Sequence, residues 1–412
     1  MRMERLPAAL LACLALLTAG ATALLPARVE EVARQVESVR GRRFERQIPA
    51  SEIDPVELKK VLRAKLLEGF PASPEDTMRT MVAIGFFEET PNLVDRLLDF
   101  YASQVIAFYD PEPRKFFLVK GGAAGIPAPE ELSSDAGERM IFAHELTHAL
   151  QDEFMKLDRR VKQLKDNGDR ALALESLLEG EATLVMVRVA LSQLPGGQSS
   201  EVEDSLAPLL SAGTLESANM PKDLPDYFAQ QLFFPYVEGT AYVRRVVKAG
   251  GWAGIDRMWK NPPATTSEIL HEGPAFTPAE DLLTAPAADR LAPAGFRTLY
   301  TDTIGEWGVR FLLRRGLAAA QADPLAAGWR GDRIAFYAAG RDIAYVWKLR
   351  FESPGAAERF ASAWTAAAKL GGAVTRRGPD LTILKTGGRS RETGKREMGN
   401  EGHQRQRSQT GN

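Results

Sequence analysis

The chain has 412 residues, 44% of them hydrophobic, and its 52 lysines and arginines are balanced by 54 aspartates and glutamates. This length allows a sizeable hydrophobic core and more than one domain. The formal net charge of −2 argues against a strongly basic, nucleic-acid-binding protein, so we expect no nucleic-acid partner.

The N-terminus has the layout of a secretory signal peptide. Arg2 and Arg5 precede an apolar run, and small residues at 21–23 form a cleavage site, so we expect residues 1–23 to be removed. The protein is therefore predicted to be exported to the periplasm or the extracellular space. An uncleaved membrane anchor is an alternative, because the apolar run Leu6–Leu25 is nearly long enough to span a bilayer.

Cys13 is the single cysteine of the chain. A lipoprotein signal around Cys13 is a third alternative, although the apolar run continues past it. A chain cleaved after Ala23 contains no cysteine. This excludes disulfides, thiolate metal ligands and a cysteine nucleophile from the mature protein.

Residues 29–100 have helical periodicity, with apolar residues at intervals of three and four in ELKKVLRAKLLEGF and PNLVDRLLDFYASQ. We expect scaffold helices here. Residues 104–119 then contain two β-prone runs separated by Asp-Pro-Glu-Pro, which predicts a hairpin and hence a small sheet. Residues 121–135 are predicted to form a loop, with Ser133 or Ser134 capping the helix that follows.

That next helix contains the sequence HELTH. On a helix, His144 and His148 lie about 40° apart on one face, with Glu145 beside them. Phe142, Ala143, Leu146, Ala149, Leu150 and Phe154 fill an arc centred roughly opposite the histidines. This pattern predicts a helix with one face in the core and the other free for chemistry.

Two histidines one turn apart form half of a zinc site, since zinc accepts neutral imidazole nitrogens and a catalytic site uses three protein ligands plus water. Glu145 is then placed to take a proton from that water, as in other H-E-x-x-H sites. The alternative is a surface helix that carries two solvated histidines.

A second strong helical pattern covers residues 169–191 and offers acidic ligands. Glu175 and Glu179 are four residues apart and share a face, whereas Glu181 lies about 200° round from Glu179 and cannot easily serve the same ion. The helical geometry leaves the third ligand as a choice between Glu175 and Glu179.

HELTH followed by LEGEA resembles the gluzincin metallopeptidases, in which a glutamate from a downstream helix completes the zinc site. Several branches carry it as E-G-x-A or E-x-x-A, which falls on Glu179, 31 residues after His148. The resemblance therefore favours Glu179 over Glu175. A closer resemblance, covering roughly residues 90–340, is to an uncharacterised group of bacterial exported proteins in the peptidase MA-like class; it is carried by QVIAFYDP, HELTHALQD, LEGEAT, FPYVEGTAYV and TTSEILH.

The resemblance also suggests two further catalytic residues, and the sequence differs from the family pattern at one position. Tyr236 and His271 stand in motifs shared with the bacterial group and are candidate donors to the oxyanion that develops on a scissile carbonyl. Many gluzincins carry an aspartate four residues after the ligand glutamate, where it orients a ligating histidine. This sequence has Thr183 there, and Asp152 is a candidate substitute.

Beyond about residue 300, two strand-like runs precede a helix with Ser353 as cap and Pro354 at its first position, and DLTILK follows as another strand. This β-β-α-β order predicts a small α+β module over residues 301–385. The remaining residues 386–412 are rich in Gly, Gln and Ser and are predicted to be a disordered tail.

The sequence thus predicts an α+β protein with a mostly helical, zincin-like metallopeptidase domain over residues 28–300 that includes a small β-sheet. The expected activity is hydrolysis of peptide bonds with Zn²⁺ held by His144, His148 and Glu179, and with a peptide or protein as substrate. Two alternatives are a zinc-binding scaffold without turnover and a zinc hydrolase of a non-peptide amide such as a cell-wall crosslink. Oligomeric state is not predicted.

Overall fold

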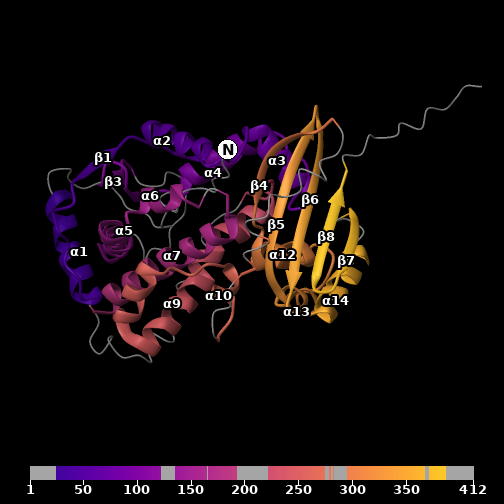
Figure 1. The fold of residues 1–412 in the computed structure, drawn as a ribbon. Helices are drawn as coiled ribbons and strands as arrows, with labels where there is room; N and C mark the ends of the chain where they lie inside the picture. The colour runs from indigo at the N-terminus through magenta and orange to yellow at the C-terminus, as the bar shows by residue number, and fades with distance from the viewer. Residues whose placement is uncertain are drawn as a thin grey trace, which may run out of the picture.

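The computed structural model describes residues 25–121, 135–164, 166–192, 221–273, 278–279, 282, 295–366 and 371–386. These residues form a mixed α+β structure in which helices predominate and two sheets lie apart (Figure 1). The predicted signal peptide, the capping serines Ser133 and Ser134, and the tail beyond residue 386 lie outside the described residues.

The first part of the chain combines helices with one sheet. Its elements are α1 (Leu25–Arg40), β1 (Ala50–Ile53), α2 (Pro55–Glu68), α3 (Pro74–Ile84), α4 (Leu93–Gln104), β2 (Ala107–Asp110), β3 (Lys115–Val119), α5 (Asp135–Met155), α6 (Leu157–Lys162), α7 (Gly168–Ser192), α9 (Asp226–Lys260) and α10 (Thr266–Leu270).

The hairpin predicted at residues 104–119 is confirmed. Strands β2 and β3 pair antiparallel across the predicted turn, and β1 extends the sheet by pairing parallel to β3. The strand order is β1-β3-β2. Strand β1 interrupts a region predicted to be only helical, because its sequence Ala-Ser-Glu-Ile contains no run of β-prone residues.

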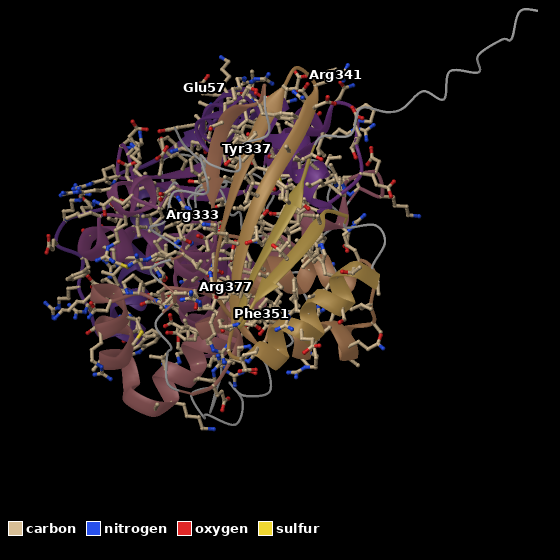
Figure 2. All side chains as sticks on the ribbon, turned by 45° about the vertical axis from the view of Figure 1, so that its right-hand side comes forward. Glu57, Arg333, Tyr337, Arg341, Phe351 and Arg377 are labelled. Carbon is tan, nitrogen blue, oxygen red and sulfur yellow. The ribbon has the colours of Figure 1, made fainter. Side chains whose placement is uncertain are left out.

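The second sheet is antiparallel, with the order β4-β5-β6-β8-β7. The elements of this part are β4 (Arg297–Asp302), α12 (Gly305–Arg314), α13 (Ala319–Ala326), β5 (Trp329–Ala339), β6 (Asp342–Phe351), α14 (Pro354–Ala366), β7 (Ala373–Arg377) and β8 (Asp380–Lys385). Figure 2 shows Arg341 at the turn between β5 and β6, with Phe351 at the opposite end of β6.

Two details of the predicted module are corrected by this sheet. It begins at Arg297, so the predicted boundary after residue 300 falls inside β4. Strand β7 was also not predicted, because this edge strand is mostly exposed and has no apolar alternation. The predicted helix cap is confirmed, since Ser353 Oγ accepts a hydrogen bond from Ala356 N.

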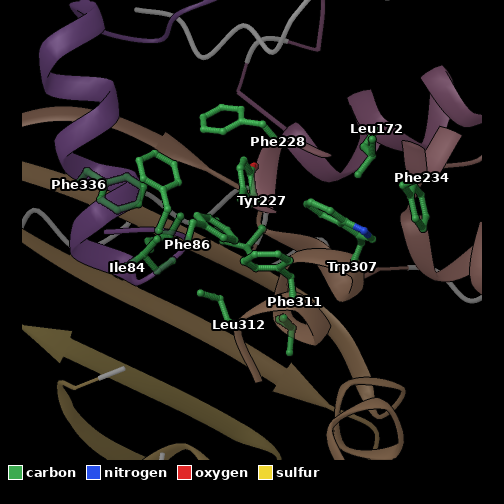
Figure 3. Packing of buried hydrophobic residues seen from close by; sticks show 14 of the residues in the cluster. Ile84, Phe86, Leu172, Tyr227, Phe228, Phe234, Trp307, Phe311, Leu312 and Phe336 are labelled. Atoms are coloured by element: carbon green, nitrogen blue, oxygen red, sulfur yellow. The ribbon is translucent and has the colours of Figure 1, made fainter. Parts of the chain in front are cut away.

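One hydrophobic core extends across both predicted domains. Figure 3 shows part of this core, where Phe86, Tyr227 and Phe311 pack together. The ring centroids are 4.6 Å apart for Phe86–Tyr227 and 5.3 Å apart for Tyr227–Phe311. The same cluster includes Leu58 of α2 and Trp347 of β6, so the C-terminal sheet packs on the helical part rather than standing apart from it.

Helix α5 is buried on all sides along its middle, and the prediction of one open face is wrong. Residues 141–153 are all buried, including His144 and His148. The helix contacts α1, α7, α9 and both strands of the hairpin, and Figure 1 views it nearly end-on among these elements. The histidines therefore lie in the protein interior. Helical periodicity identified one buried face, but packing from distant segments covers the other.

Helices α7 and α9 cross in close contact at two glycines. A Cβ atom added to Gly180 would lie 2.2 Å from the carbonyl oxygen of Gly239, and one added to Gly239 would lie 2.2 Å from the carbonyl oxygen of Ser176. Neither residue can carry a side chain unless a helix moves. Gly180, the glycine of the LEGEA motif, follows Glu179 directly and thus allows α7 to pack closely against α9.

We expect Gly180→Ala to lower the free energy of unfolding by about 3 kcal/mol, the upper part of the range for overpacking. Alanine gains only about 1 kcal/mol in helix propensity, so the backbone collision decides the sign. Denaturant titration measures the change. Gly355→Ala in α14 is the control, because its Cβ would meet only ordinary contacts beyond 3.5 Å, the nearest being Arg359 Nη1 at 3.6 Å. Equal stability of Gly180→Ala and wild type would contradict the close crossing.

No helix in the described part of the chain has both the length and the apolar composition needed to cross a membrane. Of the alternative anchor at Leu6–Leu25, all but its last residue lies outside the described residues.

Candidate metal centre

Two imidazoles from consecutive turns of α5 face each other in the interior. The Nε2 atoms of His144 and His148 are 3.1 Å apart, and their rings are nearly perpendicular. His144 is 0% exposed and His148 is 6% exposed. The spacing of four residues therefore brings both rings to one point, as the HELTH pattern predicts.

Glu179 of α7 supplies a carboxylate at the same point. Its Oε2 lies 3.0 Å from His144 Nε2, and its Oε1 lies 3.4 Å from His148 Nε2. Potential ligand atoms of the three residues all lie within 4.8 Å of one another. Glu175 is not part of this group, although it too is buried in α7. Of the two glutamates left open by helical geometry, Glu179 is the one beside the histidines.

The spacing of these donors is suitable for zinc. In a tetrahedral site with bonds of about 2.0 Å, neighbouring ligand atoms lie about 3.3 Å apart. The three separations, 3.1, 3.0 and 3.4 Å, are close to that value. Two neutral imidazoles and one carboxylate are also a known ligand set of catalytic zinc sites. The residues present therefore fit the metal implied by the sequence.

Electrostatics couple the three side chains. Burial would raise the pKa of Glu179, but the neighbouring His148 charge and the hydrogen bonds from both histidines hold it below its usual value. Burial would lower the pKa of His148, but Glu179 raises it above its usual value. For His144 burial prevails and its pKa is lowered. A cation that replaces the proton on His148 would keep the Glu179 charge compensated.

Glu145 follows His144 on α5, and its two carboxylate oxygens differ in their hydrogen bonding. Its Oε2 accepts a hydrogen bond of 2.9 Å from the backbone N–H of Tyr109 in β2. Its Oε1 has no hydrogen-bond partner among the described residues. Burial raises the pKa of Glu145 to about 8, although the His148 charge and the Tyr109 N–H favour the ionised form. A carboxylate with a pKa near neutrality is suited to exchanging protons.

The structure brings only one of the two candidate oxyanion donors to the cluster. Tyr236 of α9 is buried, and its ring stacks on that of His144 with centroids 5.9 Å apart. His271 follows α10, and its Nε2 lies 2.7 Å from Glu306 Oε1. Among the contacts of the described residues, none joins His271 to the cluster. The contact that the structure gives His271 is therefore with α12 and not with the cluster.

The prediction that Asp152 substitutes for the missing aspartate is not supported by its contacts. Asp152 accepts hydrogen bonds from Tyr109 Oη and from the backbone N–H of Leu157, and among the contacts of the described residues none joins it to either histidine. Within the described residues, Thr183 Oγ1 and His144 Nδ1 are both buried without a hydrogen-bond partner. Thr183 therefore does not replace the aspartate.

Sequence reasoning missed two groups at this site. Gln151 contacts His148, with 2.9 Å between Oε1 and Nδ1. Its position three residues after His148 was a signal, because residues three apart are neighbours on a helix. The Tyr109 N–H that holds Glu145 is a backbone group, and no side-chain pattern could have identified it.

Comparison with known proteins adds one match. Residues 295–395 match the model of a domain of unknown function, DUF8575. The match begins just before β4 and covers the second sheet, so it excludes the candidate metal centre. No curated protein and no solved structure matches the chain.

Proposed function

We propose that the protein is an exported zinc-dependent metallopeptidase of the gluzincin type, with a zincin-like arrangement of α5 and α7. The observation that carries the proposal is the convergence of His144, His148 and Glu179 at zinc-like spacing, with the Glu145 carboxylate beside them. HELTH and LEGEA, the motifs behind the family resemblance, supply these four residues from two packed helices.

His144, His148 and Glu179 would hold the ion through the atoms that already face one another. Zinc bound there would lower the pKa of a water and polarise the substrate carbonyl. Glu145, fixed through Oε2 by Tyr109, would accept the proton of the attacking water on Oε1 and pass it to the leaving amine as the C–N bond breaks. Water is consumed, and a carboxylate and an amine are released.

Tyr236 is the candidate donor to the developing oxyanion. Its ring packs against that of His144, one of the three proposed ligands. Hydroxyl donors aimed at the position where charge develops stabilise the transition state. His271 is not assigned this role, because its ring contacts Glu306 of α12.

Zinc analysis combined with digestion of a broad peptide library tests the proposal. Purified mature protein is expected to bind one zinc per chain and to cleave peptides. Cleavage should stop with a chelator and return with added zinc. Cell-wall fragments assayed in parallel would reveal hydrolysis of a non-peptide amide instead. Absence of bound zinc after loading would reject the metal centre and the enzyme together.

A zinc-binding protein without turnover is the second candidate, and burial favours it. Glu179 is 0% exposed and Glu145 is 2% exposed, so a substrate would have little access to this point of the described structure. Glu145 Oε1 favours the enzyme, because a general base needs an oxygen that can take up a proton, and no described residue forms a hydrogen bond with this one. Stoichiometric zinc with no cleavage in either substrate set would select the second candidate.

Export is proposed from the N-terminal pattern alone. N-terminal sequencing of protein from the native host is expected to begin after Ala23. Protein that retains Met1 in the cytosol would contradict export.

A further inference from the structure

A series of buried polar side chains connects His148 to the end of α1. Gln151 Oε1 lies 2.9 Å from His148 Nδ1, and Gln151 Nε2 donates to Glu181 Oε2 at 2.9 Å and to the carbonyl oxygen of Leu178 at 3.0 Å. Arg40 Nε then donates to Glu181 Oε1 at 2.5 Å. Arg40 is separated from Glu181 by 141 positions in the sequence, so the fold brings these side chains together.

Glu181 is held firmly as a hydrogen-bond acceptor. Besides its ion pair with Arg40, it accepts a bond of 2.7 Å from Trp259 Nε1. The Arg40 guanidinium lies over the rings of Trp252 and Trp259, 4.7 and 4.5 Å from their centroids. Arg40 also donates a hydrogen bond to the carboxylate of Asp256. A carboxylate in this setting accepts hydrogen bonds and donates none.

These partners determine how the amide of Gln151 is oriented. Glu181 Oε2 and the Leu178 carbonyl oxygen are both acceptors, so the NH₂ group of the amide must face them. Its oxygen then faces His148 Nδ1, which must carry a hydrogen to donate. The Nε2 atom of neutral His148 is left with its lone pair directed at the cluster with His144 and Glu179.

We propose that Gln151 and Glu181 are positioning residues that select the Nδ1–H tautomer of His148 and so present Nε2 to the metal. The inference rests on the proposed zinc centre and adds to it the residues that orient one ligand. Groups that orient a ligating histidine contribute strongly to metal affinity. Among the described residues, no side chain forms a hydrogen bond with His144 Nδ1. The proposed orienting contact therefore concerns His148 and not His144.

The test is zinc affinity, measured by chelator competition. Gln151→Leu keeps the Arg40–Glu181 pair and the Trp259 bond, so the fold should persist while zinc affinity falls about 10- to 100-fold. Glu181→Gln removes the charged acceptor and leaves the Leu178 carbonyl oxygen as the remaining acceptor for Gln151 Nε2, so zinc binding is expected to weaken by about tenfold, less than in Gln151→Leu. The control is Asp256→Asn, which removes a partner of Arg40 that does not contact Gln151 and should leave zinc affinity unchanged.

A spectroscopic measurement separates positioning from general stabilisation. The chain has only four histidines, so ¹⁵N-histidine labelling gives few NMR signals. In the zinc-loaded protein, the spectrum of His148 should show a protonated Nδ1 and a metal-bound Nε2. In Gln151→Leu the Nδ1 proton should exchange rapidly with solvent. An Nδ1-bound metal, unchanged affinity in Gln151→Leu, or an equal loss in Asp256→Asn overturns the inference. Wild type that binds no zinc overturns it together with the metal centre, whereas zinc binding without cleavage overturns the peptidase alone.

Discussion

Glu145→Gln is expected to lower peptidase activity by at least about two orders of magnitude while zinc binding stays at the wild-type level. The substitution preserves the shape of the side chain and can keep the hydrogen bond from the Tyr109 N–H. It removes the carboxylate that accepts the proton on Oε1. Because Glu145 is not in the group of ligand residues, the metal content should not change. Rates on a cleaved library peptide and zinc analysis of the same sample measure both effects.

Glu153→Gln is the matched control for this variant. Glu153 lies two turns further along α5, is 7% exposed, and also accepts a hydrogen bond from a backbone N–H, that of Glu45. It is not in the metal-binding group, so Glu153→Gln should retain activity. If wild type is active and zinc-loaded Glu145→Gln keeps more than about a tenth of its rate, Glu145 is not the general base.

Removal of any one of the three ligands is expected to abolish most zinc binding. His144→Ala, His148→Ala and Glu179→Ala each leave two protein donors, whereas a catalytic zinc site uses three. Metal analysis after dialysis measures the loss. Zinc should also raise the melting temperature of wild type, since a ligand that binds only the folded state stabilises it, and should not raise that of Glu179→Ala.

Glu175→Ala is the control that tests the choice between the two glutamates of α7. Glu175 shares a helix with Glu179 and is also buried, but it is outside the group of potential ligands. Its removal should therefore leave zinc content unchanged. Circular dichroism of each variant establishes that the fold is retained. Stoichiometric zinc in folded Glu179→Ala would move the ligand role away from Glu179.

Sequence patterns predicted five of the described strands and missed three that lie at sheet edges and are only partly buried. The buried β2 and its partner β3 were predicted, as were β5, β6 and β8. The strands missed were β1, β4 and β7, each at an edge of its sheet. A partly buried edge strand has one pairing neighbour and little need for an alternating apolar face, so its sequence carries a weak period. Strand β2 is also at an edge, but it is buried throughout and was predicted.

For the candidate site, the sequence determined the local geometry. The four-residue spacing of His144 and His148 brings two rings together on any helix, and helical geometry limits the third ligand in α7 to Glu175 or Glu179. Family resemblance favoured Glu179. These inferences concern residues close along the chain, where helix geometry alone sets which side chains are neighbours.

Only the tertiary structure decided what surrounds those side chains. The glycine crossing of α7 and α9, the Tyr109 N–H on Glu145, and the contact of Tyr236 with His144 all join segments far apart in the sequence. The same holds for the contact between His271 and Glu306. Helical periodicity in the sequence indicates that one face of a helix is buried, but it does not indicate which distant segment packs on that face. The burial of the histidines and the orientation of His148 therefore follow from long-range packing.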